Sequence, residues 1–162
     1  MHKYTIVKFI EPVADGTEFN MTEWPLHITL ADDFELGISH SDFIEQLKKL
    51  ALKQEPVKVV AESDGYLGKY SQVQVTFIDT NPDLFELHRG LVTELKRIGA
   101  VFYNPHYIIG GYRPHITVQR AARARRGDVV IINKLSIVDM SPDGDDNQRK
   151  VIETIEFAKS FV

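Results

Sequence analysis

The sequence predicts an α+β fold in which two similar lobes, related by a pseudo-twofold axis, carry antiparallel sheets with helices outside and a central groove. Three observations support this prediction. The apolar patterns give the order strand, strand, helix, two strands, helix and three strands. Two segments, Leu-His-Ile-Thr-Leu at 26–30 and Pro-His-Ile-Thr-Val at 114–118, nearly repeat each other in the two halves. No segment has the composition of an interdomain linker, so residues 1–162 are expected to form a single domain.

The first half of the chain is expected to contain four strands and one helix. The helix at 41–54 begins at Ser41, whose side chain is suited to cap it. Its apolar residues share the spacing of one helix face: Phe43, Ile44, Leu47, Leu50 and Ala51. The strands are predicted at 4–11, 25–31, 57–64 and 71–79, the last two joined around the glycines of 65–68.

The second half begins with a helix and continues with three strands. The helix at 83–98 has Pro82 at its start and Gly99 at its end, residue types that favour those positions. Its apolar stripe consists of Leu84, Leu87, Leu91 and Leu95. His88 lies on the same stripe and is expected to pack at the edge of the core. The strands are predicted at 113–119, 128–139 and 150–158, with an acidic turn at 143–147.

Composition indicates an ordinary globular protein. Of the 162 residues 43% are apolar and 26% are charged. No run approaches the roughly 20 apolar residues of a membrane span. The absence of cysteine excludes disulfides, thiolate metal sites and thiol nucleophiles. The N-terminus resembles a strand rather than a signal peptide, so we expect a cytoplasmic protein with no membrane association. No obligate protein partner is evident in the sequence.

Charge is distributed unevenly along the chain. The net charge of −4 argues against broad, non-specific binding of nucleic acid. Between residues 113 and 126, however, there are five arginines and no acidic residue. A solvent-exposed basic loop would explain such a run by itself. Its position around the second His-Ile-Thr segment favours contact with an anion.

The two repeated segments bring the same chemistry twice. Side chains of a strand alternate between faces, so in each segment the histidine and the threonine share one face and the isoleucine between them points to the other. The candidate catalytic residues are His27 and His115, and the candidate phosphate-binding residues are Thr29 and Thr117. Two imidazoles and two hydroxyls supply the groups needed to move protons around a phosphate.

With these residues the chain resembles the two-histidine phosphoesterase superfamily, which includes bacterial 2′-5′ RNA ligase-like proteins and cyclic phosphodiesterases. The hallmark of that superfamily is a pair of His-hydrophobic-Thr/Ser-hydrophobic motifs about half a chain apart in a small protein of two α/β lobes. Residues 27–30 and 115–118 both match the motif. Relatives often carry a basic residue just past the second motif, which points to Arg120 in this sequence.

The resemblance implies a metal-independent phosphodiesterase that acts on 2′,3′-cyclic phosphate or 2′-5′-linked RNA or nucleotide substrates and uses no cofactor. One histidine would be the general base on the attacking water, and the other the general acid on the leaving ribose oxygen. The two threonine hydroxyls would hydrogen-bond the non-bridging phosphate oxygens. In reverse, the same groups would join a 5′-hydroxyl to a cyclic phosphate, the ligase activity of the family name.

Two arginines are candidate phosphate contacts beside the motifs. Strand alternation puts Arg113 on the face of His115, although Pro114 disturbs the strand between them. The same alternation puts Arg120 on the opposite face unless the strand ends or bulges before it. Aromatic side chains near the motifs could stack on a base. The candidates are Trp24, Tyr66, Tyr103, Tyr107 and Tyr112.

Other classes of function have less support in the sequence. A zinc enzyme would need a His-Glu-x-x-His motif, a cysteine pair or a suitably spaced carboxylate, none of which accompanies the motifs. A P-loop or Rossmann protein would need a phosphate-binding glycine pattern, whereas residues 110–111 are the only glycine pair. The main alternative is a non-catalytic RNA- or nucleotide-binding module of the same fold. Such a module has no need of both histidines.

Overall fold

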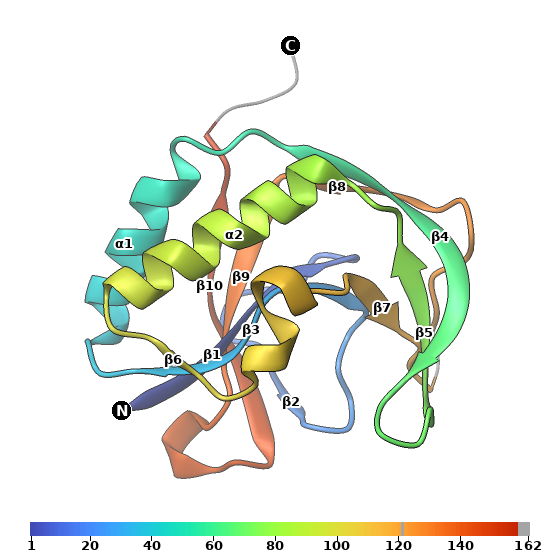
Figure 1. Ribbon diagram of the computed structural model, residues 1–162. Helices are drawn as coiled ribbons and strands as arrows, with labels where there is room; N and C mark the ends of the chain where they lie inside the picture. Colours follow the sequence, from blue (N-terminus) through green and yellow to red (C-terminus); the bar gives the residue numbers. More distant parts are fainter. Residues whose placement is uncertain (121, 159–162) are drawn as a thin grey trace.

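The computed structural model describes residues 1–120 and 122–158 of the chain (Figure 1). The strands are β1 (His2–Phe9), β2 (Glu18–Asn20), β3 (His27–Leu36), β4 (Val57–Leu67), β5 (Val73–Ile78), β6 (Val101–Phe102), β7 (His115–Thr117), β8 (Val129–Ile132), β9 (Lys134–Asp139) and β10 (Gln148–Glu156). The α-helices are α1 (His40–Ala51) and α2 (Pro82–Arg97). Three 3₁₀ helices complete the described elements: η1 (Pro105–Tyr107), η2 (Ile109–Gly111) and η3 (Pro142–Gly144).

The strands form one antiparallel sheet in the order β2-β10-β9-β1-β3-β7-β5-β4-β8, with β6 paired to β3. The strands that carry the two His-Ile-Thr segments, β3 and β7, are neighbours in this order. The predicted antiparallel arrangement with two helices is confirmed. The two motif strands do not face each other across a central groove, as the two-lobed prediction implies, because the backbone of β3 pairs directly with that of β7.

The strand order requires a strongly curved sheet. β8 lies at one end of the order and β9 six positions away, yet only Asn133 separates the two strands in the sequence. Neighbouring strands are about 4.8 Å apart, so a flat sheet would hold these positions roughly 29 Å apart. The sheet therefore bends until they meet, and in Figure 1 β8 runs directly into β9. The single strand predicted at 128–139 is accordingly two strands, which pair with different partners.

Both helices begin at side-chain caps. Ser39 caps α1 by accepting a hydrogen bond from the backbone N–H of Asp42. The predicted cap, Ser41, already lies inside the helix, because Ser39 is the residue that keeps the extended backbone of a cap. Asn81 caps α2 by accepting bonds from two backbone N–H groups of the first turn, and Pro82 takes the first helical position. No helix within the described residues is long and apolar enough to cross a membrane.

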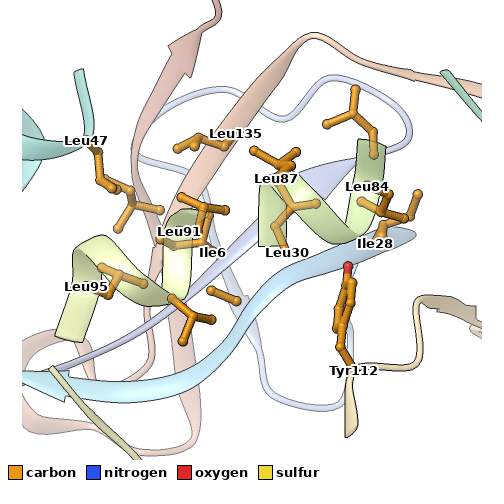
Figure 2. Packing of buried hydrophobic residues seen from close by; sticks show 14 of the residues in the cluster. Ile6, Ile28, Leu30, Leu47, Leu84, Leu87, Leu91, Leu95, Tyr112 and Leu135 are labelled. Carbon is orange, nitrogen blue, oxygen red and sulfur yellow. The ribbon is translucent and has the colours of Figure 1, made fainter. Parts of the chain in front are cut away.

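The helices and the sheet share one large apolar core. Figure 2 shows the leucines of α2 packed together with side chains of the sheet, among them Ile6, Ile28, Leu30 and Leu135. Ile28 and Ile116, the middle residues of the two motifs, are fully buried in this core. A smaller cluster contains no helix residue: Val7, Phe9, Val138 and Val151, with Val13, Phe19, Trp24 and Met140 against them. Because side chains alternate along a strand, the motif histidines lie on the face away from the main core.

The second motif strand is shorter than predicted. Strand β7 covers residues 115–117 instead of 113–119. Pro114 has no N–H to donate, so the ladder cannot continue through it in the usual way. Beyond β7 the chain turns, and Gln119 pairs with Ala122 as an isolated bridge. Strands β2 and β6 are absent from the prediction because two or three residues show no measurable periodicity.

Candidate active site

The four motif side chains lie on adjacent strands, around one point of contact. The central isoleucines of the two motifs are directly paired. In an antiparallel ladder the flanking residues then face each other too, so His27 lies opposite Thr117, and Thr29 lies opposite His115. Opposite side chains have Cβ atoms about 4.5–5.5 Å apart, and diagonal neighbours are about 7–8 Å apart. The two histidines are diagonal neighbours, a separation that leaves room for one phosphate group.

The strands on either side repeat the same register. Each places a phenylalanine opposite the motif histidine and a valine opposite the motif threonine. The pairs are Phe9 with His27, Val7 with Thr29, Phe77 with His115 and Val75 with Thr117. The closing backbone hydrogen bonds also match, both at 3.0 Å: Ile10 N–H to the Leu26 carbonyl, and Ile78 N–H to the Pro114 carbonyl. Each motif therefore occupies the same local setting, next to a partner strand of the same pattern.

The flanking phenylalanines are absent from the predicted site, although the sequence contains a signal for them. Residues 7–11 are Val-Lys-Phe-Ile-Glu and residues 75–79 are Val-Thr-Phe-Ile-Asp. The two segments share their first, third and fourth residues and end in an acidic residue. A search for a second internal repeat would have identified β1 and β5 as the equivalent partners of the motif strands.

Each motif histidine is oriented by the carbonyl group two residues before it. The Nδ1–H group of His27 donates to the Pro25 carbonyl at 2.8 Å, and that of His115 donates to the Arg113 carbonyl at 2.7 Å. A carbonyl can only accept, so Nδ1 carries the proton in both rings. In the neutral ring Nε2 then holds the free lone pair. Both imidazoles are thus in the tautomer that leaves Nε2 available for proton transfer.

Burial keeps both imidazoles neutral near pH 7 in the ligand-free protein. It lowers the pKa of His27 to about 4, with the hydrogen bond to Pro25 opposing the shift and the nearby His115 ring adding to it. The pKa of His115 is also lowered, by burial first, while its bond to the Arg113 carbonyl opposes the shift and the Arg113 charge adds to it. The two histidines are therefore chemically similar but not equivalent.

Trp24 lies directly beside His27. The two ring centroids are 4.6 Å apart with an interplanar angle of 38°. The Phe9 ring meets the same imidazole edge-on, with centroids 6.2 Å apart, and the Phe19 ring packs edge-on against Trp24, with centroids 5.0 Å apart. These aromatic rings remove water from the imidazole, which is the physical cause of its strong pKa shift. The indole is thus an aromatic surface at the edge of the site.

Arg113 is held beside His115 by an aromatic ring. Its guanidinium carbon lies 4.6 Å from the centroid of Phe77, the residue opposite His115 on β5. The Phe77 ring in turn lies over Gly65, where a Cβ atom would come within 2.4 Å of Phe77 Cε2. Arg113 is exposed, and no carboxylate in the described part of the chain is within salt-bridge distance of it. Its charge is available to an anion.

Arg120 is directed to a different place. The strand ends at Thr117, and Arg120 lines a cavity of about 790 Å³ together with Ile116 and Val118. Ile116 belongs to the face of the sheet opposite the motif histidines. Of the two predicted arginines, Arg113 is the one beside a motif histidine.

His88 and the stacking candidate Tyr112 are buried structural groups. His88 is 1% exposed, deeper than the expected core edge, because both ring nitrogens are satisfied by backbone. Its Nδ1–H donates to the Leu30 carbonyl at 2.7 Å, and its Nε2 accepts from the Ile109 N–H at 2.9 Å. Tyr112 stacks on the His88 ring at 3.8 Å and is 7% exposed, so it cannot also stack on a base. The remaining stacking candidates, Tyr66, Tyr103 and Tyr107, are exposed.

Metal ligands are not assembled in the described residues. No group of three or more His, Asp or Glu side chains there has the arrangement needed to hold a metal ion. The two motifs themselves contribute two imidazoles and two hydroxyls.

Comparisons with known proteins identify a family model and a shared fold. Residues 6–131, which include both motifs, match the model of the 2′-5′ RNA ligase superfamily. A search of curated protein sequences found no significant match. A solved structure described as a phosphoesterase has a TM-score of 0.63 and 16% identity, over 98% of this chain and 99% of that chain.

Two further solved structures are similar over almost the whole chain. TT0787 of Thermus thermophilus has a TM-score of 0.57 and 18% identity, over 97% of this chain and 98% of its own. E. coli LigT complexed with NADP+ has a TM-score of 0.57 and 16% identity, over 98% of both chains. At these identities the matches establish the fold.

Proposed function

The chain belongs to the 2′-5′ RNA ligase superfamily, and from that premise we propose that it is a metal-independent phosphodiesterase. Its substrates are 2′,3′-cyclic phosphates or 2′-5′-linked RNA or nucleotides. The pairing of β3 with β7 carries the proposal. It brings two imidazoles and two hydroxyls to one face of the sheet, with the histidines as diagonal neighbours, a spacing that suits contact with one phosphate.

His27 and His115 divide the proton transfers between them. One neutral imidazole takes a proton from water as the water oxygen attacks phosphorus. The other, protonated, gives a proton to the ribose oxygen as its bond to phosphorus breaks. Thr29 and Thr117 donate hydrogen bonds to the non-bridging oxygens, where negative charge is spread in the transition state. Because each histidine lies opposite the threonine of the other motif, both strands contribute to each side of the phosphate.

The substrate supplies the charge that the acid histidine needs. Both imidazoles have lowered pKa values in the free protein. A phosphate anion beside an imidazole stabilises the protonated ring and raises its pKa. Substrate binding therefore favours a state in which His27 and His115 share one proton. One ring is then the acid and the other is the base.

Arg113 is the proposed additional phosphate contact. Its guanidinium is exposed, lies over Phe77 and carries no ion pair to a described carboxylate. Arg120 lines the cavity on the opposite face of the sheet, so its proposed partner is a more distant phosphate of a longer substrate. An Arg113→Gln variant should raise KM for a mononucleotide, whereas Arg120→Gln should affect only oligonucleotides.

We propose a nucleotide or an RNA end as the body of the substrate. Solved structures of E. coli LigT hold NADP+, 3′-AMP and ATP, and another holds phosphate. In this chain Trp24, beside His27, is the proposed stacking surface for a base next to the reacting phosphate. Base–aromatic stacking contributes about 1–3 kcal/mol.

We also infer that residues 1–162 form one domain whose halves arose by duplication about a pseudo-twofold axis between β3 and β7. Two matched sequence repeats and the matched registers of β1 with β3 and β5 with β7 support this inference. A duplicated origin accounts for a site with two copies of each group.

A substrate screen tests the proposed function. Purified protein is incubated with 2′,3′-cyclic nucleotides, RNA with a cyclic phosphate end, 2′-5′-linked dinucleotides and ADP-ribose 1″,2″-cyclic phosphate, with and without EDTA. Product regiochemistry is then determined. We expect EDTA-resistant turnover of at least one of these classes, lost on replacement of either motif histidine. Nucleotide binding without any turnover would instead identify a non-catalytic binding module.

A further inference from the structure

The direct connection between the two motif strands is small. Strand β7 has three residues, and it pairs with β3 at Ile28 and Ile116. Pro114, just before β7, has no N–H with which to extend the pairing. A second link joins the strands beside this pair: the hydroxyl of Tyr112 donates to the carbonyl of Thr29 at 2.7 Å. The acceptor is the threonine of the first motif, and the donor lies three residues before the histidine of the second.

The Tyr112 side chain is held by contacts with two rings as well as by its hydrogen bond to Thr29. Its ring stacks on His88 with centroids 3.8 Å apart and an interplanar angle of 6°, and it meets Phe85 edge-on at 5.5 Å. His88 is itself fixed by hydrogen bonds to the Leu30 carbonyl and the Ile109 N–H. Helix α2 therefore supports, through His88, both the strand of the first motif and the loop that leads to the second.

The loop before the second motif is tightly built. Ile109 has φ +56°, a left-handed conformation that is unfavourable for a β-branched residue and that its bond to His88 helps to hold. A Cβ atom on Gly111 would lie 1.8 Å from the carbonyl oxygen of His106, so the chain passes close to itself there. A loop constrained in this way can transmit the position of Tyr112 to the residues that follow it.

We propose that Tyr112 is a positioning residue for the phosphodiesterase reaction: its hydrogen bond to the Thr29 carbonyl fixes Thr29 relative to His115. The proposal rests on the proposed function. Thr29 and His115 lie opposite each other, so a shift of one strand along the other changes the gap between hydroxyl and imidazole that the phosphate fills. Misplacement of reacting groups by about 1 Å can cost on the order of 10²-fold in rate. Loss of one hydrogen bond produces a smaller shift and a smaller loss.

Tyr112→Phe removes the hydroxyl and keeps the ring that stacks on His88. Tyr70→Phe is the matched control, since Tyr70 is 77% exposed, lies in the turn between β4 and β5 and has no proposed role in the site. We expect Tyr112→Phe to lower kcat about 3- to 10-fold, with KM within twofold and the limbs of the pH profile unchanged. The transition state depends more on hydroxyl placement than the bound substrate does, because charge builds up on the phosphate oxygens. The control should match the wild type.

The outcomes separate the positioning role from a structural one and from the proposed function. A merely structural hydroxyl would lower Tm and leave kcat unchanged at temperatures well below Tm, so unchanged kcat in Tyr112→Phe overturns the inference alone. In that case His27→Ala and His115→Ala still abolish turnover. If neither histidine variant changes turnover, the proposed function fails and the positioning role fails with it.

Discussion

Replacing Gly65 with alanine tests whether the Phe77 ring keeps Arg113 in position beside His115. Gly65 pairs with Val75 in the sheet and does not have a left-handed backbone, so alanine suits the strand itself. The obstacle is the ring. The new Cβ would lie 2.4 Å from Phe77 Cε2, whereas ordinary contact begins near 3.4 Å, so the ring must move by about 1 Å.

The expected loss in free energy of unfolding is modest. Overpacking typically costs about 1–3 kcal/mol. The half-buried Phe77 ring can move toward solvent, which favours the lower part of that range. Removing a glycine from a strand restores about 0.5–1 kcal/mol. With an overpacking cost of about 1–2 kcal/mol, the net destabilisation is therefore about 0–1.5 kcal/mol.

The displaced ring also changes the site. Arg113 loses a cation–π contact that contributes about 0.5–1 kcal/mol at an exposed position. If that energy holds the guanidinium where it meets the substrate phosphate, KM rises about two- to fivefold. In a protein that already carries Arg113→Gln, Gly65→Ala should cause little further rise in KM, because both changes act through the Arg113 guanidinium.

Denaturant unfolding and steady-state kinetics on a cyclic nucleotide measure both effects. Gly90→Ala is the matched control, since nothing lies within 4 Å of its new Cβ and it stands in α2. Alanine there should stabilise the protein by about 1 kcal/mol. A Gly65→Ala variant that is as stable as the Gly90→Ala variant, with unchanged KM, would refute the reasoning.

Three further predictions concern the motifs and the titration of histidines. Either His27→Ala or His115→Ala should lower turnover at least about 10²-fold in a folded protein, whereas Thr29→Ala or Thr117→Ala should lower it only about tenfold. The loss in the double histidine variant should be far smaller than the product of the two single losses. Full turnover in either histidine variant contradicts the mechanism. The pH profile of kcat/KM should be bell-shaped, because the active free protein carries one proton on the histidine pair. Its maximum should lie between about pH 4 and 6.5, since the pKa of His27 is about 4 and that of His115 is below its ordinary 6.5. Turnover that rises steadily above pH 7 would exclude that assignment. Tm should fall as pH drops below about 6.5, because burial lowers the pKa of His27, His88 and His115, so the folded state binds fewer protons than the unfolded chain. His88→Gln should remove the His88 share of this slope in calorimetry.

Local patterns in the sequence determine most of the elements. Helix α2 was predicted at 83–98 and observed at Pro82–Arg97, because its leucine stripe, its first proline and its final glycine are all local signals. The alternation that buries Ile28 and turns His27 to the other face is a property of any strand. The cap of α1 shows the limit of such signals: Ser39 and Ser41 are both suitable residues, and the sequence does not distinguish them.

The sequence by itself also determined which chemical groups are repeated: two imidazoles, two hydroxyls and the residues between them. Only the tertiary structure decided how these groups meet. Three features depend on contacts between distant segments: the pairing of β3 with β7, the split of the strand at 128–139, and the position of Arg113 rather than Arg120 beside a motif histidine. Burial of Tyr112 against His88 is of the same kind. Periodicity reports which face of an element is apolar, whereas the packing of the whole chain determines which faces and which strands come together.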